Sequence, residues 1–334
     1  MEYRKLISFG KSSYVVSLPK SWIVQNKLKK GDLIYLEESG PNLMLSKQDQ
    51  EESKIEQKII INVDGKSLNQ IKREVNSSYI LNYRTIVLKG EKINTNIKNL
   101  QNIFQNLIAL EMMEQTPNSL VAKDFLNMEK VSISELIHKM DIVTRTMFKE
   151  SYKDYTLENY ENVNERDKDV NRLYFLLYRA VLYNFENPLK ALKNFKLNPV
   201  DLLNILFNGF YIEGIADEVR RTARYACNLK MNEKESQILK KFMDKLYQYY
   251  LDNMKAIYSV DQELALKLSD MKTTLNKELD SFEENNKKND INSYKDYISM
   301  INRVRRLISY IHSLGRTVYQ GYNYCGIVKE TQPL

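Results

Sequence analysis

The feature that most constrains the fold is a helical pattern that fills the last two hundred residues of the chain. Apolar positions recur with helical spacing over six ranges, 132–154, 159–185, 199–228, 232–258, 261–285 and 291–321. The 334 residues include only 10 Gly and 6 Pro, so the composition also favours long helices. Long helices joined by short loops predict antiparallel bundles, and these six fall into two sets of three.

The last helix of each set has a similar sequence, which indicates a weak internal duplication. The two similar segments are residues 206–228 and 294–317. Over residues 131–324 this layout resembles PhoU, the phosphate-uptake regulator family built from two three-helix bundles. The residues that carry the resemblance are 164–181 and 211–223, and the match is weaker in the second bundle.

The PhoU resemblance implies an acidic segment on one helix that faces an acid-x-x-x-Asp segment on another. Here these are Asp167, with Asn171, and the pair Glu213 and Asp217. Residues four apart share one helix face, and three carboxylates form an all-oxygen site that suits Mg, Mn or Fe. The alternative is an ion-paired surface, with Arg220 or Arg221 as the partners.

The second bundle departs from this acidic pattern. Asp270 stands in the place of the first acid, but Asn302 and Arg306 stand where the acidic pair belongs. Because an arginine repels a cation, we expect a metal in the first bundle only. The cluster Arg303-Arg305-Arg306 could bind an anion or an acidic partner, or could be a solvated face in contact with acids such as Asp296.

The net charge of +7 is concentrated at the start of the chain. The first 30 residues contain seven Lys and Arg but one acid, Glu2. Such a charge distribution is typical of a protein that binds a polyanion, most often nucleic acid, although a merely soluble basic terminus would have it too.

The same segment predicts strand, strand, short helix, strand, strand within 48 residues. Strands are expected at 3–9, 14–18, 33–37 and 43–47, and the helix at 20–26. A unit of this size buries little apolar surface alone, so we expect it to dimerise.

Residues 1–48 resemble the AbrB/SpoVT swapped-hairpin domain. The matching features are Gly10, Leu18-Pro19-Lys20, Leu28, Lys30-Gly31-Asp32 and the closing hairpin. The resemblance implies an intertwined dimer that binds double-stranded DNA through basic residues on one face. It assigns DNA contacts to Arg4, Lys11 and Lys20, with neighbouring polar contacts from Ser12, Ser13 and Tyr14. We expect Lys29 and Lys30 to be a solvated turn instead.

Between these regions, residues 49–57 predict a linker and 58–130 a small α/β segment. Strands are expected at 58–63, 84–89 and 119–125, and helices at 67–79 and 96–113. Residues 325–334 are expected to be a tail. The fold class is therefore mainly α, with a small N-terminal β domain and a small α/β segment before two helical bundles.

Several classes of function are not expected. The two cysteines, Cys227 and Cys325, lack metal-site spacing, and no apolar run approaches the roughly 20 residues of a membrane span. No nucleophile–histidine arrangement or phosphate loop is present, so we expect no enzyme; a metal-dependent phosphatase is the remaining catalytic alternative. A cytoplasmic protein without membrane insertion is expected.

The first hypothesis is a DNA-binding transcriptional regulator of phosphate uptake and intracellular phosphate homeostasis. The body would sense a state or bind a phosphate transporter ATPase or a sensor kinase, and the protein would be a homodimer or higher homo-oligomer. The alternative is a PhoU-like accessory protein that negatively regulates a phosphate transporter by protein contact, without operator-specific DNA binding.

Overall fold

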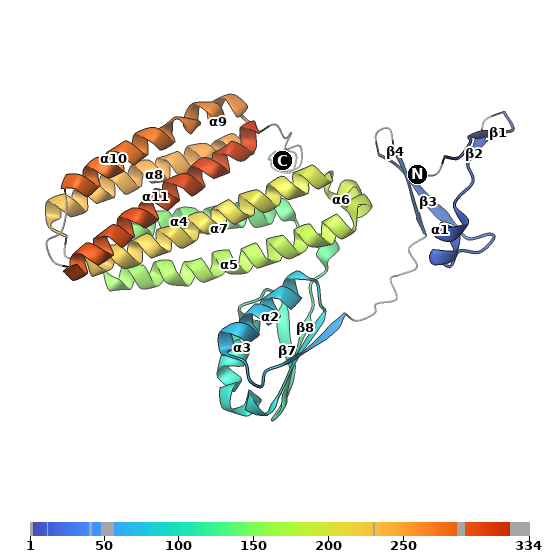
Figure 1. Cartoon of the computed structure of the whole chain (residues 1–334), viewed down its shortest axis with the longest axis horizontal. Coiled ribbons are helices and arrows are strands. Elements are labelled where there is room, and N and C mark those ends of the chain that lie inside the picture. Colours follow the sequence, from blue (N-terminus) through green and yellow to red (C-terminus); the bar gives the residue numbers. More distant parts are fainter. Residues whose placement is uncertain are drawn as a thin grey trace, which may run out of the picture. The chain divides into compact units, whose positions relative to one another are not determined.

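The computed structural model describes residues 3–11, 13–39, 42–47, 57–229, 231–285 and 291–320. The chain forms two compact units, Met1–Ile55 and Glu56–Leu334, which are considered separately (Figure 1). The expected fold class is confirmed: the protein is mainly helical, with small hairpins at the N-terminus and an α/β segment before the helices. The expected tail, 325–334, and nearly all of the expected linker lie outside the described residues.

The first unit, which we call the head, has the predicted order of elements. Its elements are β1 (Ile7–Phe9), β2 (Ser13–Val15), α1 (Lys20–Gln25), β3 (Ile34–Ser39) and β4 (Asn42–Lys47). β1 pairs with β2 and β3 with β4, each as an antiparallel hairpin. Gly10 and Gly31 adopt φ values of +72° and +97°, which explains why glycine stands at these two turns.

The head has almost no core of its own. Among its described side chains none is buried, and large apolar side chains on both hairpins face solvent. They include Leu6, Ile7, Phe9, Tyr14, Leu33, Tyr35 and Leu36. So much exposed apolar surface on so small a unit is typical of an interaction surface.

The α/β segment at the start of the second unit is a sheet covered by two helices. It contains β5 (Lys58–Asn62), α2 (Leu68–Ile80), β6 (Thr85–Lys89), the 3-10 turn η1 (Glu91–Asn96), α3 (Ile97–Gln105), β7 (Leu110–Thr116) and β8 (Ser119–Asp124). The strand order is β5-β6-β8-β7, with β5 and β6 parallel and the other pairs antiparallel. Apolar residues of α2 and α3, such as Val75 and Phe104, pack on sheet residues such as Ile86 in one core.

The predicted helix over 96–113 is wrong in its second half. The helix α3 ends at Gln105, and residues 110–116 form the edge strand β7 instead. Ala109, with φ +60°, reverses the chain between the two elements. The segment then pairs with β8 as an antiparallel strand, with one register shift between Met112 and Glu114, and this pairing outweighs the local helical period.

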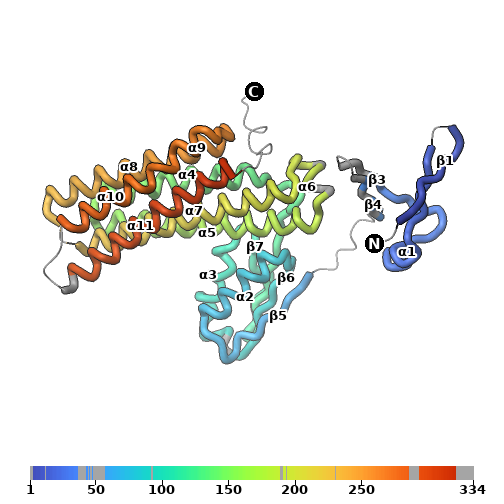
Figure 2. Tube along the Cα trace, turned by 45° about the horizontal axis from the view of Figure 1, so that its top comes forward, coloured from blue at the N-terminus to red at the C-terminus, as the bar shows by residue number. Residues whose placement is uncertain are grey.

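The helical body follows as α4 (Ile133–Ser151), α5 (Leu157–Glu186), α6 (Pro188–Phe195), α7 (Pro199–Asn228), α8 (Glu233–Ser259), α9 (Gln262–Ser269), α10 (Met271–Asn285) and α11 (Ile291–Tyr319). Helices α4, α5 and α7 pack together, and α11 packs with α8, α9 and α10. The two sets meet along α7 and α11, which lie side by side (Figures 1 and 2). One continuous apolar core runs through both sets.

Side-chain caps explain where these helices begin. The Ser132, Thr156 and Asp261 side chains each accept a hydrogen bond from a first-turn amide. Asn198 with Asp201, and Asn232 with Glu235, form reciprocal capping boxes. The predicted helix over 261–285 is divided at Asp270 into α9 and α10, and the short helix α6 occupies a region predicted as a connection.

The long helices approach each other closely at two glycines of α7. A Cβ added at Gly209 would lie 2.2 Å from Leu177 Cδ2 of α5, and one added at Gly214 would lie 2.9 Å from the Tyr310 ring of α11. These glycines therefore set the spacing of α7 against both neighbours. In the described ranges, no helix is both long enough and apolar enough to cross a bilayer.

A buried arginine joins the α/β segment to the body. Arg179 of α5 is fully buried and donates to Asp124 Oδ2 at 2.6 Å and to Asn82 Oδ1 at 2.8 Å. Its guanidinium also lies over the Tyr79 ring, 4.6 Å from the centroid. Arg84, which directly precedes β6, makes a second ion pair with Asp124, so two arginines share one buried carboxylate.

Candidate functional site

The basic residues assigned to DNA contact lie on exposed positions of the head. Lys11 is in the turn between β1 and β2, Lys20 is the first residue of α1, and Arg4 precedes β1. Ser13 and Tyr14 belong to β2, in register with Phe9 and Ser8 of β1, and are exposed as well. Ser12 lies outside the described residues.

Lys29 and Lys30 occupy a turn, which is what the sequence predicted for them. The Lys29 backbone amide donates to Asp32 Oδ2 at 2.8 Å, and Gly31 supplies the positive φ. The Lys-Gly-Asp sequence therefore has a structural role in turn formation, while both lysine side chains remain exposed.

The three carboxylates of the acid cluster, which we define as Asp167, Glu213 and Asp217, come from α5 and α7 as predicted. Burial raises the pKa of Glu213 to about 7, and the neighbouring charges of Asp217 and Asp167 act in the same direction. Burial likewise raises the pKa of Asp167, although Arg220 opposes this. The sequence therefore identified three acids that share one electrostatic environment.

Two arginines of α7 are inserted among these acids. Arg220 lies 2.6 Å from Asp217 Oδ1 and 3.1 Å from Asp167 Oδ2, and Arg221 lies 2.8 Å from Asp217 Oδ2. Asn171 also donates to Asp167 Oδ2, at 3.1 Å. This is the ion-paired alternative that the sequence left open.

One carboxylate oxygen of the cluster is buried without a hydrogen-bond donor from the described residues. Asp167 Oδ1 is buried and accepts no hydrogen bond in the described part of the chain. Within the same residues, no three His, Cys, Asp or Glu side chains are grouped as a metal ion would require. Both oxygens of Asp217 are engaged by arginine, and only Asp167 Oδ1 and the Glu213 carboxyl stand outside the ion pairs found among the described residues.

A fourth acid of α7, Glu218, was not predicted from the sequence. It is only 2% exposed, and its Oε1 lies 3.5 Å from Arg303, 3.6 Å from Arg306 and 3.8 Å from Arg221. Burial raises the pKa of Glu218, and Arg303 lowers it. The only signal in the sequence was its place next to Asp217, because the pairing with α11 depends on the packing of the two bundles.

The arginines of α11 are therefore divided between two neighbours. Arg303 and Arg306 face Glu218 of α7, while Arg305 pairs with Asp280 at 2.8 Å and Glu283 at 3.0 Å on α10. Asp296, which the sequence suggested as a partner, forms none of the ion pairs found among the described residues. The Asp270 side chain is separate from these pairs, at the break between α9 and α10.

No family model matches the chain, and no curated protein matches it. Among solved structures, the chain is similar to the crystal structure of PhoU from Pseudomonas aeruginosa. The match has a TM-score of 0.49 and 15% sequence identity, and it covers 60% of this chain and 96% of that chain.

Proposed function

We propose that this protein is a DNA-binding transcriptional regulator of phosphate uptake and phosphate homeostasis. The head would dimerise and bind double-stranded DNA, and the helical body would receive the signal or bind a protein partner. The proposal places the protein in the cytoplasm, without catalytic activity.

The observation that supports the DNA-binding part is the surface of the head. Arg4, Lys11 and Lys20 are exposed on a unit whose hairpins leave apolar side chains without a core. A second copy of the head would cover apolar side chains such as Phe9 and Leu36, and the pair of heads would present two sets of basic residues to a duplex. The order of elements in the head is also the order that the residue pattern of residues 1–48 predicts.

The experiment compares the affinity of the full-length protein for two duplexes at one salt concentration. One duplex is taken from upstream of phosphate-transport genes, and the other has the same composition in scrambled order. A regulator of this type should prefer the first duplex by at least about 10³-fold. Equal affinity for both duplexes would contradict operator recognition.

A second candidate function is favoured by an apolar stripe on α7. Val200, Leu203, Phe207 and Phe210 are exposed at helical spacing, so one face of this helix is incompletely covered by the residues that the structure describes. This face favours the accessory protein that regulates a phosphate transporter by contact with its ATPase, or with a sensor kinase. This candidate predicts that the transporter ATPase co-purifies with the unaltered protein but not with a Phe207→Asp variant. It also predicts that the unaltered protein has no affinity for DNA.

We also propose a test of Mg, Mn or Fe binding at the acid cluster. A cation could use Asp167 Oδ1 and Glu213, but as arranged here the site does not fit a metal, because Arg220 and Arg221 neutralise Asp217. Thermal unfolding with each metal and with a chelator measures whether a cation displaces these arginines. A metal response that is absent from a Glu213→Ala/Asp217→Ala variant and kept in Asp270→Ala would support the site. No response in the unaltered protein would refute it.

A further inference from the structure

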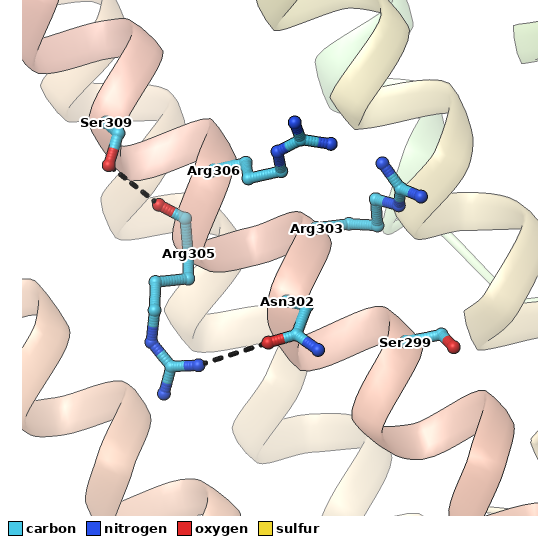
Figure 3. Close-up of a pocket in the computed structure, with 6 residues that line it drawn as sticks. All are labelled: Ser299, Asn302, Arg303, Arg305, Arg306 and Ser309. Carbon is cyan, nitrogen blue, oxygen red and sulfur yellow. Dashed lines mark hydrogen bonds between the residues drawn. The ribbon is translucent and has the colours of Figure 1, made fainter.

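A shallow, solvent-open depression of about 440 Å³ lies on the outer face of α11. The described residues that line it are of polar or basic type: Ser299, Asn302, Arg303, Arg305, Arg306 and Ser309 (Figure 3). Arg303 and Arg306 extend toward α7, and Arg305 extends to the other side, with Asn302 between them. Among the described residues, none of those that line the depression carries a carboxylate.

The charges around the depression are unequal. Arg221, Arg303 and Arg306 all face the single buried carboxylate of Glu218, at N–O distances of 3.5 to 3.8 Å. A charge-assisted hydrogen bond to a carboxylate is normally about 2.7–2.9 Å long, so these contacts are loose. Arg221 is bound more closely by Asp217, at 2.8 Å, so the two arginines of the depression, Arg303 and Arg306, share the Glu218 carboxylate as their acid among the described ion pairs.

The arginine donors of the depression are also unequally used. Arg305 is engaged by Asp280, Glu283 and Asn302. Arg306, by contrast, has a side chain that is 59% exposed, and its one ion pair among the described residues is the 3.6 Å contact with Glu218. Because a guanidinium has five N–H donors in a planar fork, Arg306 and Arg303 retain donors that can bind an anion from solvent.

The surroundings are electropositive beyond the depression itself. Arg224 and Arg303 both lower the pKa of the Tyr225 hydroxyl, Arg224 through a 3.0 Å hydrogen bond. The Ser299 hydroxyl, which lines the depression, interacts with the same tyrosine. Arginines together with hydroxyl and amide groups are the donor set that proteins use for tetrahedral phosphate oxygens.

We propose that this depression, bordered by Arg303 and Arg306, binds a small phosphate-class anion, either orthophosphate or a condensed phosphate. Because the depression is open to solvent, it admits a hydrated anion, and its volume exceeds that of a single phosphate. The site lies on α11, whereas the acid cluster lies on α5 and α7. At the place in α11 where the first bundle has its acidic pair, the sequence has Asn302 and Arg306. Phosphate binding at this depression does not depend on DNA binding by the head.

The test is isothermal titration of the full-length protein with orthophosphate, pyrophosphate, tripolyphosphate and sulfate at constant ionic strength. Arg306→Gln should weaken binding at least about tenfold, the loss expected for a charge-assisted hydrogen bond. Arg316→Gln is the matched control, because it removes the same charge from an exposed position of the same helix and should leave affinity unchanged. The ranking of the phosphates distinguishes orthophosphate from a condensed phosphate.

A second variant protects the test against a folding defect. Asn302→Asp keeps the size of an exposed side chain but places a carboxylate in the depression, so it should also abolish binding. Equal affinity of Arg306→Gln and Arg316→Gln, or no binding of any phosphate by the unaltered protein at millimolar concentration, would overturn the proposal. A drop in DNA affinity in Arg306→Gln would instead assign the depression to nucleic acid. If phosphate binding fails while salt-dependent DNA binding persists, only the phosphate site is refuted.

Discussion

At the scale of single residues, the acid cluster shows how far a sequence pattern can locate a site. Spacing predicted that Glu213 and Asp217 share a face of one helix, and the family resemblance added Asp167 from another. The structure brings all three into one electrostatic environment. It also places Arg220 and Arg221 between them, which spacing alone could not decide, because an arginine can turn toward either side of its helix.

The raised pKa of Glu213 leads to a pH-dependent stability. The pKa of Glu213 is about 7 in the folded protein, against an ordinary value of 4.5. The unfolded chain therefore releases the Glu213 proton at a lower pH than the folded protein does. Unfolding is therefore favoured as pH rises from about 4.5 to about 7, by on the order of 2 kcal/mol after allowance for its partial exposure. Glu213→Gln should remove this loss of stability.

Urea unfolding at pH 4.5, 6 and 8 measures the effect. Glu161→Gln, on an exposed position of α5, is the matched control and should follow the unaltered protein. If Glu213→Gln and the unaltered protein show the same dependence of unfolding free energy on pH, the Glu213 carboxyl is not held in a buried acidic environment.

At the scale of helices and strands, the sequence predicted most elements and failed where the outcome depended on distant contacts. Caps such as Ser67, Asn198 and Asn232 identify helix starts, because a side chain satisfies free amides within the same turn. The strand β7 was mistaken for helix because its partner β8 provides the decisive hydrogen bonds. The division at Asp270 was missed because Asp270 itself keeps helical dihedral angles.

The junction between the α/β segment and the body depends on Arg179, a residue that no sequence motif singled out. Removing one partner of a buried ion pair leaves the other without compensation, at a cost of about 3–5 kcal/mol. Arg84 still pairs with Asp124, so Arg179→Met should lie near the lower end of this range. Chemical denaturation gives the change in the free energy of unfolding.

Lys168→Met is the control for Arg179→Met on the same helix. Lys168 forms an exposed ion pair with Glu165, so its loss should change stability by less than about 1 kcal/mol. Equal effects of the two substitutions would show that Arg179 does not hold the α/β segment against α5.

At the scale of the whole molecule, the proposed function requires two heads to associate. Leu36 is exposed on β3 within one chain, and burying a leucine side chain contributes about 1.5–3 kcal/mol. A symmetric dimer contains this contact twice, so Leu36→Ser should weaken dimerisation of the full-length protein at least about a hundredfold. Sedimentation equilibrium measures the dissociation constant.

Leu81→Ser is the matched control for dimerisation, because Leu81 is exposed on the α/β segment and not on the head. It should leave the dissociation constant unchanged. A full-length protein that stays monomeric at all concentrations, or dimerises equally well with Leu36→Ser, would refute association through the head.

The most direct test of DNA binding through the head is the salt dependence of the affinity of the full-length protein for a duplex. Removing one lysine–phosphate interaction should flatten the plot of log K against log salt by about 0.9, so removing four from a dimer should flatten it by about 3.6. We expect this for Lys11→Ala/Lys20→Ala, measured by fluorescence anisotropy. Lys29→Ala/Lys30→Ala removes the same charge from the turn before Asp32 and should leave the slope nearly unchanged. Identical slopes and affinities for the unaltered protein and the Lys11→Ala/Lys20→Ala variant would contradict DNA binding through the head.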